Sequence, residues 1–186
     1  MSPPRRRPTP EQLAAADGVE LPDLVADGVR VLFVGINPGL WSGATGRHFG
    51  NPANRLWPVL HQAGFTPRRF GPDDAAELLA LGYGITNLVA RTTATAAELS
   101  REELRAGVPR LEATVRRHQP RTVAFLGLSS YRTAFDRPRA QVGPLEERVA
   151  DVPAWLLPNT SGLNAHYQLP DLVRLYRELH AAVRSG

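Results

Sequence analysis

Residues 31–40 read VLFVGINPGL, and this stretch decides the fold prediction. Its first four residues are apolar and have the composition of a buried parallel strand. The chain must then turn sharply, because Gly35 and Gly39 allow close backbone approach or positive φ and Pro38 fixes φ. Asn37 is therefore predicted at the carboxyl end of a strand, where open α/β sheets bind ligands. The alternative is a plain Asn-Pro-Gly turn without a function.

Short apolar segments alternate with amphipathic segments along the rest of the chain. Strands are predicted at 31–34, 84–89, 122–126 and 155–157, and helices at 53–63, 73–81, 101–118, 129–135 and 170–183. This alternation predicts an α/β fold with three α-β-α layers and a short central parallel sheet covered on both faces. Ser100 and Glu103 form a capping box that starts the long helix. Residues 136–154 read as a loop with one edge strand.

The N-terminal segment differs from the rest in composition. Residues 2–8, SPPRRRP, are rich in proline and arginine, which is typical of disorder. Thr9 is predicted to cap a short helix, and residues 18–28 read as a linker. We therefore expect a flexible basic arm and linker over 1–28 and one domain over 29–186.

Composition excludes several kinds of chemistry. The chain has no cysteine, so it has no disulfide, thiolate zinc site or cysteine nucleophile. All 22 basic residues are arginine, so no lysine can form a Schiff base. The five histidines are scattered without ligand spacing, and no nucleotide-binding glycine motif is present, so we expect no metal and no cofactor.

The net charge of +4 and the pI of about 10.3 favour an anionic partner. No run of eighteen apolar residues indicates a membrane span, and no apolar signal-peptide core follows Met1. A cytoplasmic protein without a membrane partner is therefore expected.

Two polar loops follow predicted strands. Residues 40–57, LWSGATGRHFGNPANRLW, are too long and too rich in hydrogen-bonding groups for a simple connector. Residues 156–164, LLPNTSGLN, run from a strand into a second polar loop that contains glycine. The carboxyl ends of the strands are thus predicted to carry two candidate ligand-binding loops.

These segments resemble the mismatch-specific uracil/thymine-DNA glycosylases of the uracil-DNA glycosylase superfamily. The matching motifs, in the family's order and spacing, are GINPGL with the downstream HF and NPANRLW, then TNLV with RTT at 86–93, then LPNTSGLN. The resemblance runs from about Val29 to the C-terminus. It implies the uracil-DNA glycosylase fold.

The resemblance also implies an activity and a partner. The expected function is a monofunctional DNA glycosylase of base excision repair that hydrolyses the N-glycosidic bond of uracil in mismatched duplex DNA. Thymine and modified pyrimidines stay open as further substrates. The expected partner is double-stranded DNA that holds uracil or a mismatch, bound by a monomer in the bacterial cytoplasm at the nucleoid. The alternative is a non-catalytic DNA-binding module of the same fold that recognises damage.

Site residues follow from the matched positions. Asn37 is the expected catalytic residue, which would hold the attacking water. The expected base pocket consists of Ile36, Ser42, Phe49 and Asn87. Small side chains at Ser42 and Ala44 would leave room near C5 of the base. Phe49 would stack on the base, although a core position is the alternative.

Gly162, Leu163 and Asn164 match the loop that wedges into DNA, where an apolar side chain replaces a lost stacking partner. Three positions depart from the family pattern. Asn87 stands where lysine is common in the bacterial mismatch-specific branch, so a charge is absent there, and Asn87 either adds a hydrogen bond near the catalytic water or is a satisfied residue at the end of a strand. The other two departures lie in the wedge loop. Thr160 stands where proline is common in bacterial relatives, and Ala165 stands where a basic residue can occur, which puts a phosphate contact by this loop in doubt.

Four further residues have less specific assignments. Arg47, Arg55 and Arg91 flank the site loops and are expected to contact DNA phosphates. His48 either stabilises the departing base or is simply solvated. The Arg-rich arm either grips phosphates or is a plain tail.

Overall fold

The computed structural model describes residues 7–185 and places five strands in one central sheet. The strands are β1 Val31–Gly35, β2 Tyr83–Asn87, β3 Val123–Leu126, β4 Gly143–Pro144 and β5 Ala154–Leu157. Their order in the sheet is β2-β1-β3-β5-β4. All pairs are parallel except β4 with β5. The helices are α1 Pro10–Ala15, α2 Leu40–Thr45, α3 Leu56–Ala63, α4 Ala75–Ala80, α5 Arg101–His118, α6 Leu128–Ala134 and α7 Leu169–Ser185, with short 3-10 turns at Pro72–Asp74 and Ala96–Glu98.

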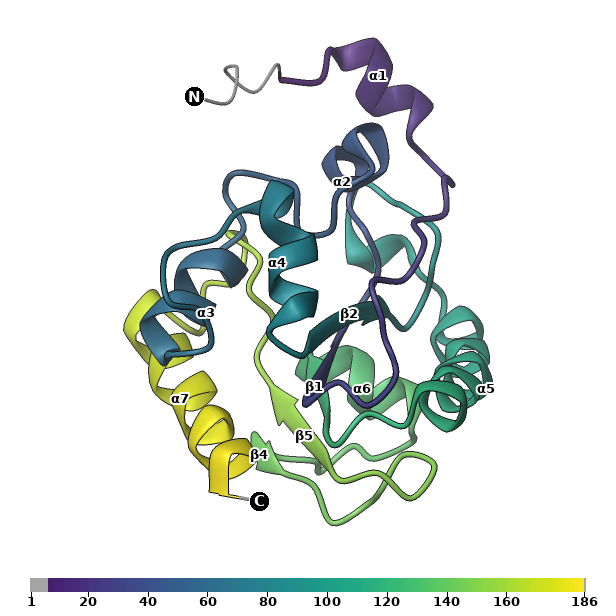
Figure 1. The fold of residues 1–186 in the computed structure, drawn as a ribbon. Helices are drawn as coiled ribbons and strands as arrows, with labels where there is room; N and C mark the ends of the chain where they lie inside the picture. Colours follow the sequence, from purple (N-terminus) through teal and green to yellow (C-terminus); the bar gives the residue numbers. More distant parts are fainter. Residues whose placement is uncertain (1–6, 186) are drawn as a thin grey trace.

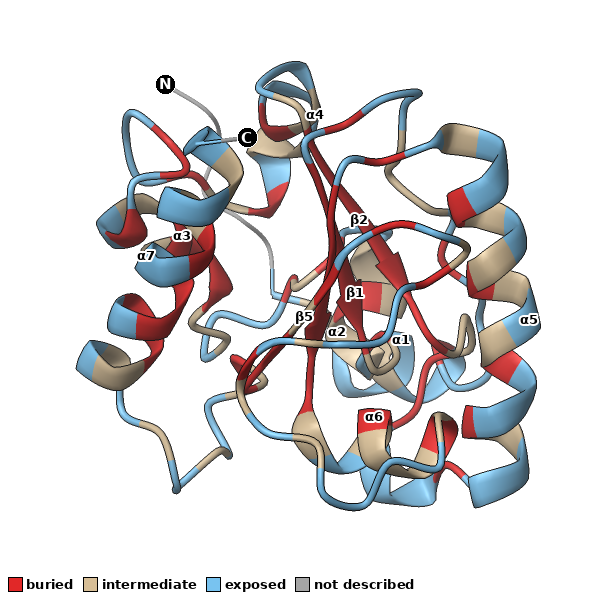
Figure 2. Ribbon diagram, turned by 90° about the horizontal axis from the view of Figure 1, so that it is seen from below, coloured by how far each residue is buried: buried red, intermediate tan, exposed pale blue. Residues whose placement is uncertain are grey.

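The apolar run of β1 is buried on both of its faces. Val31 and Phe33 pack in one core with α3, α4 and α7, whereas Leu32 and Val34 pack in a second core with α5 and α6. Side chains alternate across a strand, so a run of consecutive apolar residues supplies both cores. Figure 2 shows the buried strands between the two helical layers. The predicted three-layer α-β-α fold is thus confirmed.

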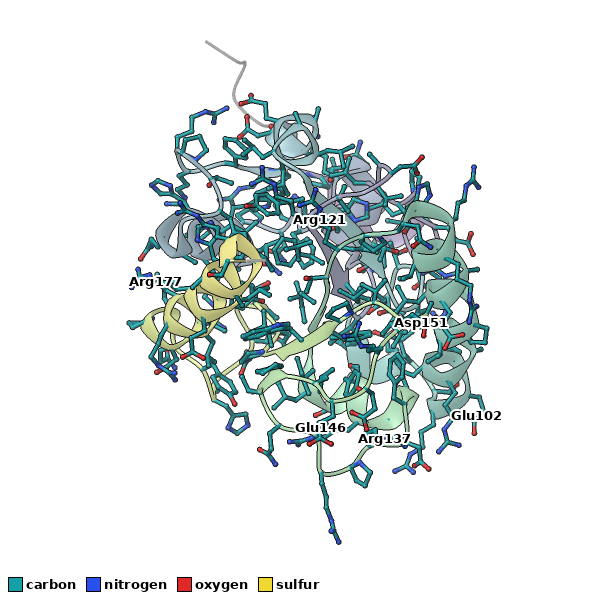
Figure 3. The ribbon with its side chains drawn as sticks, turned by 60° about the horizontal axis from the view of Figure 1, so that its bottom comes forward. Glu102, Arg121, Arg137, Glu146, Asp151 and Arg177 are labelled. Atoms are coloured by element: carbon teal, nitrogen blue, oxygen red, sulfur yellow. The ribbon has the colours of Figure 1, made fainter. Side chains whose placement is uncertain are left out.

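The outer sides of the helical layers are polar. Figure 3 shows Glu102 on α5 and Arg177 on α7, which project outward from different sides of the molecule. None of the described helices is both long and apolar enough to span a membrane.

The strand order fixes where a ligand can bind. The chain leaves β1 for β2 on one side and later crosses back to β3 on the other side of β1. Open α/β sheets bind ligands outside the carboxyl ends of the strands at such a reversal. The turn that contains Asn37 follows β1 directly, so it lies at this point (Figure 1).

Several local predictions need correction. The loop after β1 is not irregular throughout, because it contains α2. The helix expected from residue 53 begins at Leu56, since the Asn54 side chain accepts a hydrogen bond from the Leu56 N–H and holds the preceding residues in a turn. The helix expected at 73–81 is divided into a 3-10 turn and α4. The expected edge strand exists as β4.

The segment 18–28, which we expected to be a linker, lies along the outer edge of β2. Leu24 exchanges backbone hydrogen bonds of 2.8 and 2.7 Å with Ile85. Asp23 accepts a hydrogen bond of 2.6 Å from the Thr86 hydroxyl. These contacts cover the edge of the sheet, which otherwise exposes unpaired backbone groups. The Arg-rich residues 2–6 lie outside the described part of the chain.

Helix α5 begins with the predicted capping box of Ser100 and Glu103. Its buried residues are Leu104, Gly107, Leu111 and Val115, and this spacing puts them on one face against the sheet. Gly107 packs directly on the backbone carbonyl of Leu88, where an added Cβ would overlap the oxygen. A glycine inside this helix therefore permits the close approach of α5 to the end of β2.

Gly107→Ala should destabilise the protein even though alanine favours a helix by about 1 kcal/mol over glycine. Overlap with the Leu88 carbonyl forces α5 outward, and such overpacking costs about 1–3 kcal/mol. Chemical denaturation would measure the change in the free energy of unfolding. The control is Ala113→Gly at an exposed position of α5, which reports the difference in helix propensity alone. A Gly107→Ala variant more stable than the parent would contradict the packing argument.

Candidate active site

A cavity of about 820 Å³ opens at the carboxyl end of the sheet. Its walls come from the turn 35–39, the segment 40–54, residues 93–96 and the loop 159–166. All the residues expected in the catalytic position, base pocket and wedge line it: Ile36, Asn37, Ser42, Phe49, Asn87, Gly162, Leu163 and Asn164. The two polar loops that are far apart in the sequence therefore face one common space.

Asn37 is held by its side-chain nitrogen. The nitrogen donates to the carbonyl of Arg91 at 3.0 Å, to the carbonyl of Pro38 at 3.2 Å and to the hydroxyl of Thr93 at 2.7 Å. Two of these partners are carbonyls, which only accept, so the orientation of the amide is determined. The side-chain oxygen of Asn37 accepts no hydrogen bond from any other residue of the described chain. It remains available to a water or a ligand in the cavity.

Thr93 is a site residue that the sequence analysis did not identify. Its buried hydroxyl accepts from Asn37 and donates to the carbonyl of Thr95 at 2.8 Å. The backbone also joins the two segments, because the N–H of Thr93 donates to Pro38 and the N–H of Val89 donates to Ile36. The motif RTT at 91–93 was the available sequence signal, but only the fold shows that it supports Asn37.

Gly35 allows Asn87 and Phe49 to approach the end of β1. A Cβ on Gly35 would overlap the side-chain oxygen of Asn87 and come within 3.3 Å of the Phe49 ring. The requirement is thus close approach, and Gly39 needs neither space nor positive φ, since its φ is −82° and an added Cβ would meet nothing. Asn87 is only 4% exposed, and its side chain has no hydrogen-bond partner among residues 7–185. Its amide faces the cavity as an unused donor and acceptor.

Phe49 is neither an ordinary core residue nor a free surface ring. It is half-buried, lines the cavity and packs against the core of α3 and α7. Its φ of +50° is rare for a bulky residue. The Trp57 indole donates to the Phe49 carbonyl at 3.2 Å, and the N–H of Gly50 donates to the Ser42 hydroxyl at 3.0 Å. These two hydrogen bonds, at the carbonyl of Phe49 and at the N–H of the next residue, hold Phe49 in its left-handed backbone conformation.

His48 is buried, so of the two alternatives for this residue the solvated histidine is excluded. It is 8% exposed, and its Nε2 lies 2.8 Å from the carbonyl of Pro22. A carbonyl only accepts, so Nε2 carries the proton. Burial lowers the pKa of His48, although the hydrogen bond to Pro22 and the charge of Asp23 oppose the change. The ring is therefore neutral near pH 7, and it ties the site loop to the segment 18–28.

The loop 159–167 presents one large apolar side chain to solvent. Leu163 is 84% exposed, far more than any other large hydrophobic residue of the described chain. Asn164 holds the loop's shape, because its side chain donates to the Asn159 carbonyl at 3.0 Å and accepts from the His166 N–H at 3.1 Å. Gly162 packs against the Ala53 carbonyl, where a Cβ would come within 2.8 Å.

Thr160 has a role that proline could not fill in the same way. Its hydroxyl donates to the Asn54 side chain at 2.8 Å, and its carbonyl accepts from the Arg55 N–H at 2.9 Å. The departure at Thr160 thus joins the loop to the turn before α3. Ala165 and the exposed His166 lie on the cavity rim.

The three arginines expected at phosphates have different surroundings. Arg91 forms a two-pronged ion pair with Glu103, at 2.6 and 3.1 Å, and this pairing lowers the pKa of Glu103 to about 2. Arg55 donates to three backbone carbonyls of the loop 159–167. Arg47 is half-exposed and pairs with Asp73. The phosphate contacts remain a prediction. Arg47 is the best candidate of the three, because its half-exposed side chain can exchange Asp73 for a phosphate group.

Two residues lie elsewhere than expected. Leu13 of α1 lines the cavity, although its segment was assigned to the N-terminal arm. It is placed there because α1 packs on α2 (Figure 1) and the Thr92 hydroxyl donates to the Ala16 carbonyl. Ala44 does not line this cavity. It borders a separate hollow between α1 and α2 that also includes Arg7 and Arg47.

Within residues 7–185, no three side chains of histidine, aspartate or glutamate lie close enough together to hold a metal ion. The polar groups that line the cavity are amides, hydroxyls, the imidazoles of His48 and His166, and backbone groups. Such groups bind and orient a polar molecule and a water by hydrogen bonds.

The buried, neutral His48 predicts a pH dependence of stability. Its folded pKa lies below the unfolded value of about 6.5, so the unfolded chain takes up the proton first as the pH falls. Its contribution to stability is therefore complete above that value and is lost as the pH drops through the lower folded pKa. His48→Gln should flatten the decline of Tm with acidification in this window. Thermal unfolding measured from pH 7.5 to 5 checks this.

The exposed His166 provides the control, since His166→Gln should leave the decline as it is in the parent. Identical pH profiles for the parent and His48→Gln would contradict the assignment of a neutral, buried ring.

Comparison with known proteins places the chain in a family. The model of the uracil DNA glycosylase superfamily matches residues 22–180. The solution NMR structure of a candidate uracil DNA glycosylase from Methanosarcina acetivorans is similar in fold, with a TM-score of 0.58. That match covers 88% of this chain and 98% of the other at 16% sequence identity. The family match spans the sheet, the Asn37 turn and the loop 159–167, and the chain belongs to the uracil DNA glycosylase superfamily.

Proposed function

We propose that this protein is a monofunctional DNA glycosylase that hydrolyses the N-glycosidic bond of uracil in mismatched duplex DNA. The observation that carries the proposal is the anchored amide of Asn37. Three acceptors fix its nitrogen, and its oxygen is left at the cavity of a superfamily member. Membership supports glycosylase chemistry, whereas uracil as the substrate and the preference for mismatches are part of the proposal.

Asn37 can orient a water but cannot deprotonate it. Bond breaking must therefore run ahead of water attack. The C1′–N1 bond breaks, its electron pair leaves with uracil, and the sugar becomes cationic. The oxygen of the water held by Asn37 then bonds to C1′, and its proton passes to the departing base or to solvent. Such a reaction favours bases that are stable as anions.

The cavity offers the groups that a flipped uracil needs. Phe49 gives a flat face for stacking, which is worth about 1–3 kcal/mol per base. The backbone N–H groups of Ile36 and Phe49 donate to no other group in the described part of the chain, so they can donate to the carbonyls of the base. The unpartnered amide of Asn87 can pair with its polar edge.

Leu163 is proposed to fill the space that the flipped nucleotide leaves in the DNA. It is exposed, and the loop around it is held by internal hydrogen bonds. Apolar wedges of this kind replace lost stacking between base steps. Gly162 offers backbone groups to the guanine that has lost its partner, while Asn164 maintains the loop.

A panel of duplexes that differ only in the target base and its partner tests the function. Alkali cleaves the strand wherever a base has been removed, and uracil opposite guanine should give the fastest cleavage. Tight binding to uracil-containing duplex without any cleavage would instead support the alternative of a non-catalytic recognition module.

Asn37→Ala should lose most of the excision activity while it keeps lesion binding, because the pocket and the loop 159–167 stay intact. Misplacing a reacting group by about 1 Å can cost about 100-fold, so a loss of at least that size is expected in single-turnover excision. Binding to an uncleavable duplex is the control. Equal single-turnover rates for Asn37→Ala and the parent would disprove the catalytic assignment.

Leu163→Ala should reduce excision from U·A pairs more than from U·G mismatches and barely affect single strands. The lost contact of Leu163 with the bases is worth about 1–3 kcal/mol. A weak base pair costs less free energy to open, so less of this contact is needed to compensate for it. Single-turnover rates on the three substrates measure the pattern. Equal losses on all three substrates would show that Leu163 supports the fold and does not enter DNA.

A further inference from the structure

The loop 159–167 must keep its shape if Leu163 is to enter DNA. Short internal bonds contribute, since the Asn159 side chain accepts from the Ser161 N–H and the Ser161 hydroxyl accepts from the Leu163 N–H, both at 3.2 Å. These bonds lie within a few residues of one another. They do not by themselves fix the loop to the body of the protein.

The side chain of Arg55 connects the loop to the body of the protein at three points. The guanidinium of Arg55 donates to the carbonyl of Ser161 at 2.6 Å, to that of Asn164 at 3.1 Å and to that of Tyr167 at 2.8 Å. These carbonyls lie before, just after and well beyond Leu163. The planar fork of arginine can reach several acceptors at once, which an ammonium group cannot do with the same geometry.

Arg55 is also an isolated charge. No carboxylate pairs with it among the described residues, and its buried Nε has no hydrogen-bond partner. A half-buried cation without a counter-ion is costly, and unsatisfied buried donors are rare in native structures. Three carbonyl dipoles are its compensation, so the guanidinium and the loop depend on each other.

The backbone beside Arg55 reinforces the attachment. The Arg55 N–H donates to Thr160 at 2.9 Å, the Asn54 side chain accepts from the Thr160 hydroxyl, and Gly162 packs on Ala53. Three consecutive residues, 53–55, therefore each contact the loop. Because Arg55 is also the residue before α3, the loop is fixed to a helix end that packs in the core.

We propose that Arg55 is a positioning residue that holds the loop 159–167 in the shape that presents Leu163 to DNA. This inference rests on the proposed function, because it assigns Leu163 a role in base excision. It gives Arg55 a role other than the phosphate contact expected from the sequence. A loop ordered before binding loses less conformational entropy when it enters the duplex.

The test compares Arg55→Met, which keeps an unbranched side chain without donors, with Arg55→Lys, which keeps the charge without the fork. Arg132→Met is the matched control. Arg132 lies on α6, and its guanidinium likewise donates to a backbone carbonyl, that of Ala140, at 2.9 and 2.7 Å. Far-UV circular dichroism spectra and thermal unfolding followed by circular dichroism check that each variant is folded.

Excision supplies the first readout. Arg55→Met should reproduce the pattern of Leu163→Ala, with a loss of about tenfold on U·A, a smaller loss on U·G and the smallest on single strands. Arg55→Lys should lie between Arg55→Met and the parent. In the double variant with Leu163→Ala, the Arg55→Met loss should largely disappear, because Arg55 acts by presenting the Leu163 side chain, and the effects of two residues that act through one another are non-additive. Equal losses on all three substrates, or full additivity, would overturn the proposal.

Hydrogen–deuterium exchange supplies a readout that does not depend on catalysis. Peptides that cover 159–168 should exchange faster in Arg55→Met than in the parent or in Arg132→Met, while peptides of β1 and α5 stay unchanged. Unchanged exchange in 159–168 would overturn the positioning role. If the parent excises no base from any substrate, the proposed function fails, and this exchange measurement alone decides whether Arg55 orders the loop.

Discussion

The hydrogen bonds to the Asn37 amide depend on the way in which β1 and β2 continue beside each other after both strands have ended. Gly35 pairs in register with Asn87, and the chain then keeps backbone contacts from Ile36 to Val89 and from Pro38 to Thr93. This extended pairing brings the Arg91 carbonyl and the Thr93 hydroxyl to the Asn37 nitrogen. The catalytic assignment therefore rests on sheet register. A shift of one residue would turn these groups away from the cavity.

A second set of contacts joins the two loops that border the cavity. The turn 53–55 and the loop 159–167 are separated by more than a hundred residues, yet they bind through Thr160, Gly162 and the Arg55 guanidinium. The strands contribute to this junction through the helices that they support. The sheet places α3 and α7 side by side in one core, and their N-terminal connections then meet at the cavity. The rigidity of the proposed wedge is thus a consequence of helix packing together with a cation shared among carbonyls.

The sequence predicted the elements that depend on local patterns. The apolar run of β1, the capping box of α5 and the alternation of strands and helices are each readable within a few residues, and the structure confirms them. Predictions from the sequence failed where tertiary contacts determine the environment of a residue. His48 looks like a solvated loop residue, and only the approach of Pro22 buries it. Leu13 carried no signal, and Thr93 lay in the matched motif RTT without any sign of its contact with Asn37, because both places at the cavity come from segments distant in the chain.

By itself the sequence determined the fold class and the position of Asn37 at the end of a buried strand, while most of the other expected cavity residues came from the family resemblance. Hydrophobic periodicity and turn residues act over short distances, so a single chain read in order contains that information. The tertiary structure decided which atoms of those residues are free. It fixed the Asn37 nitrogen and freed its oxygen, left the Asn87 amide unpartnered, and turned Arg55 from the surface toward three carbonyls. Those outcomes depend on which distant groups meet in three dimensions, and no local pattern encodes that.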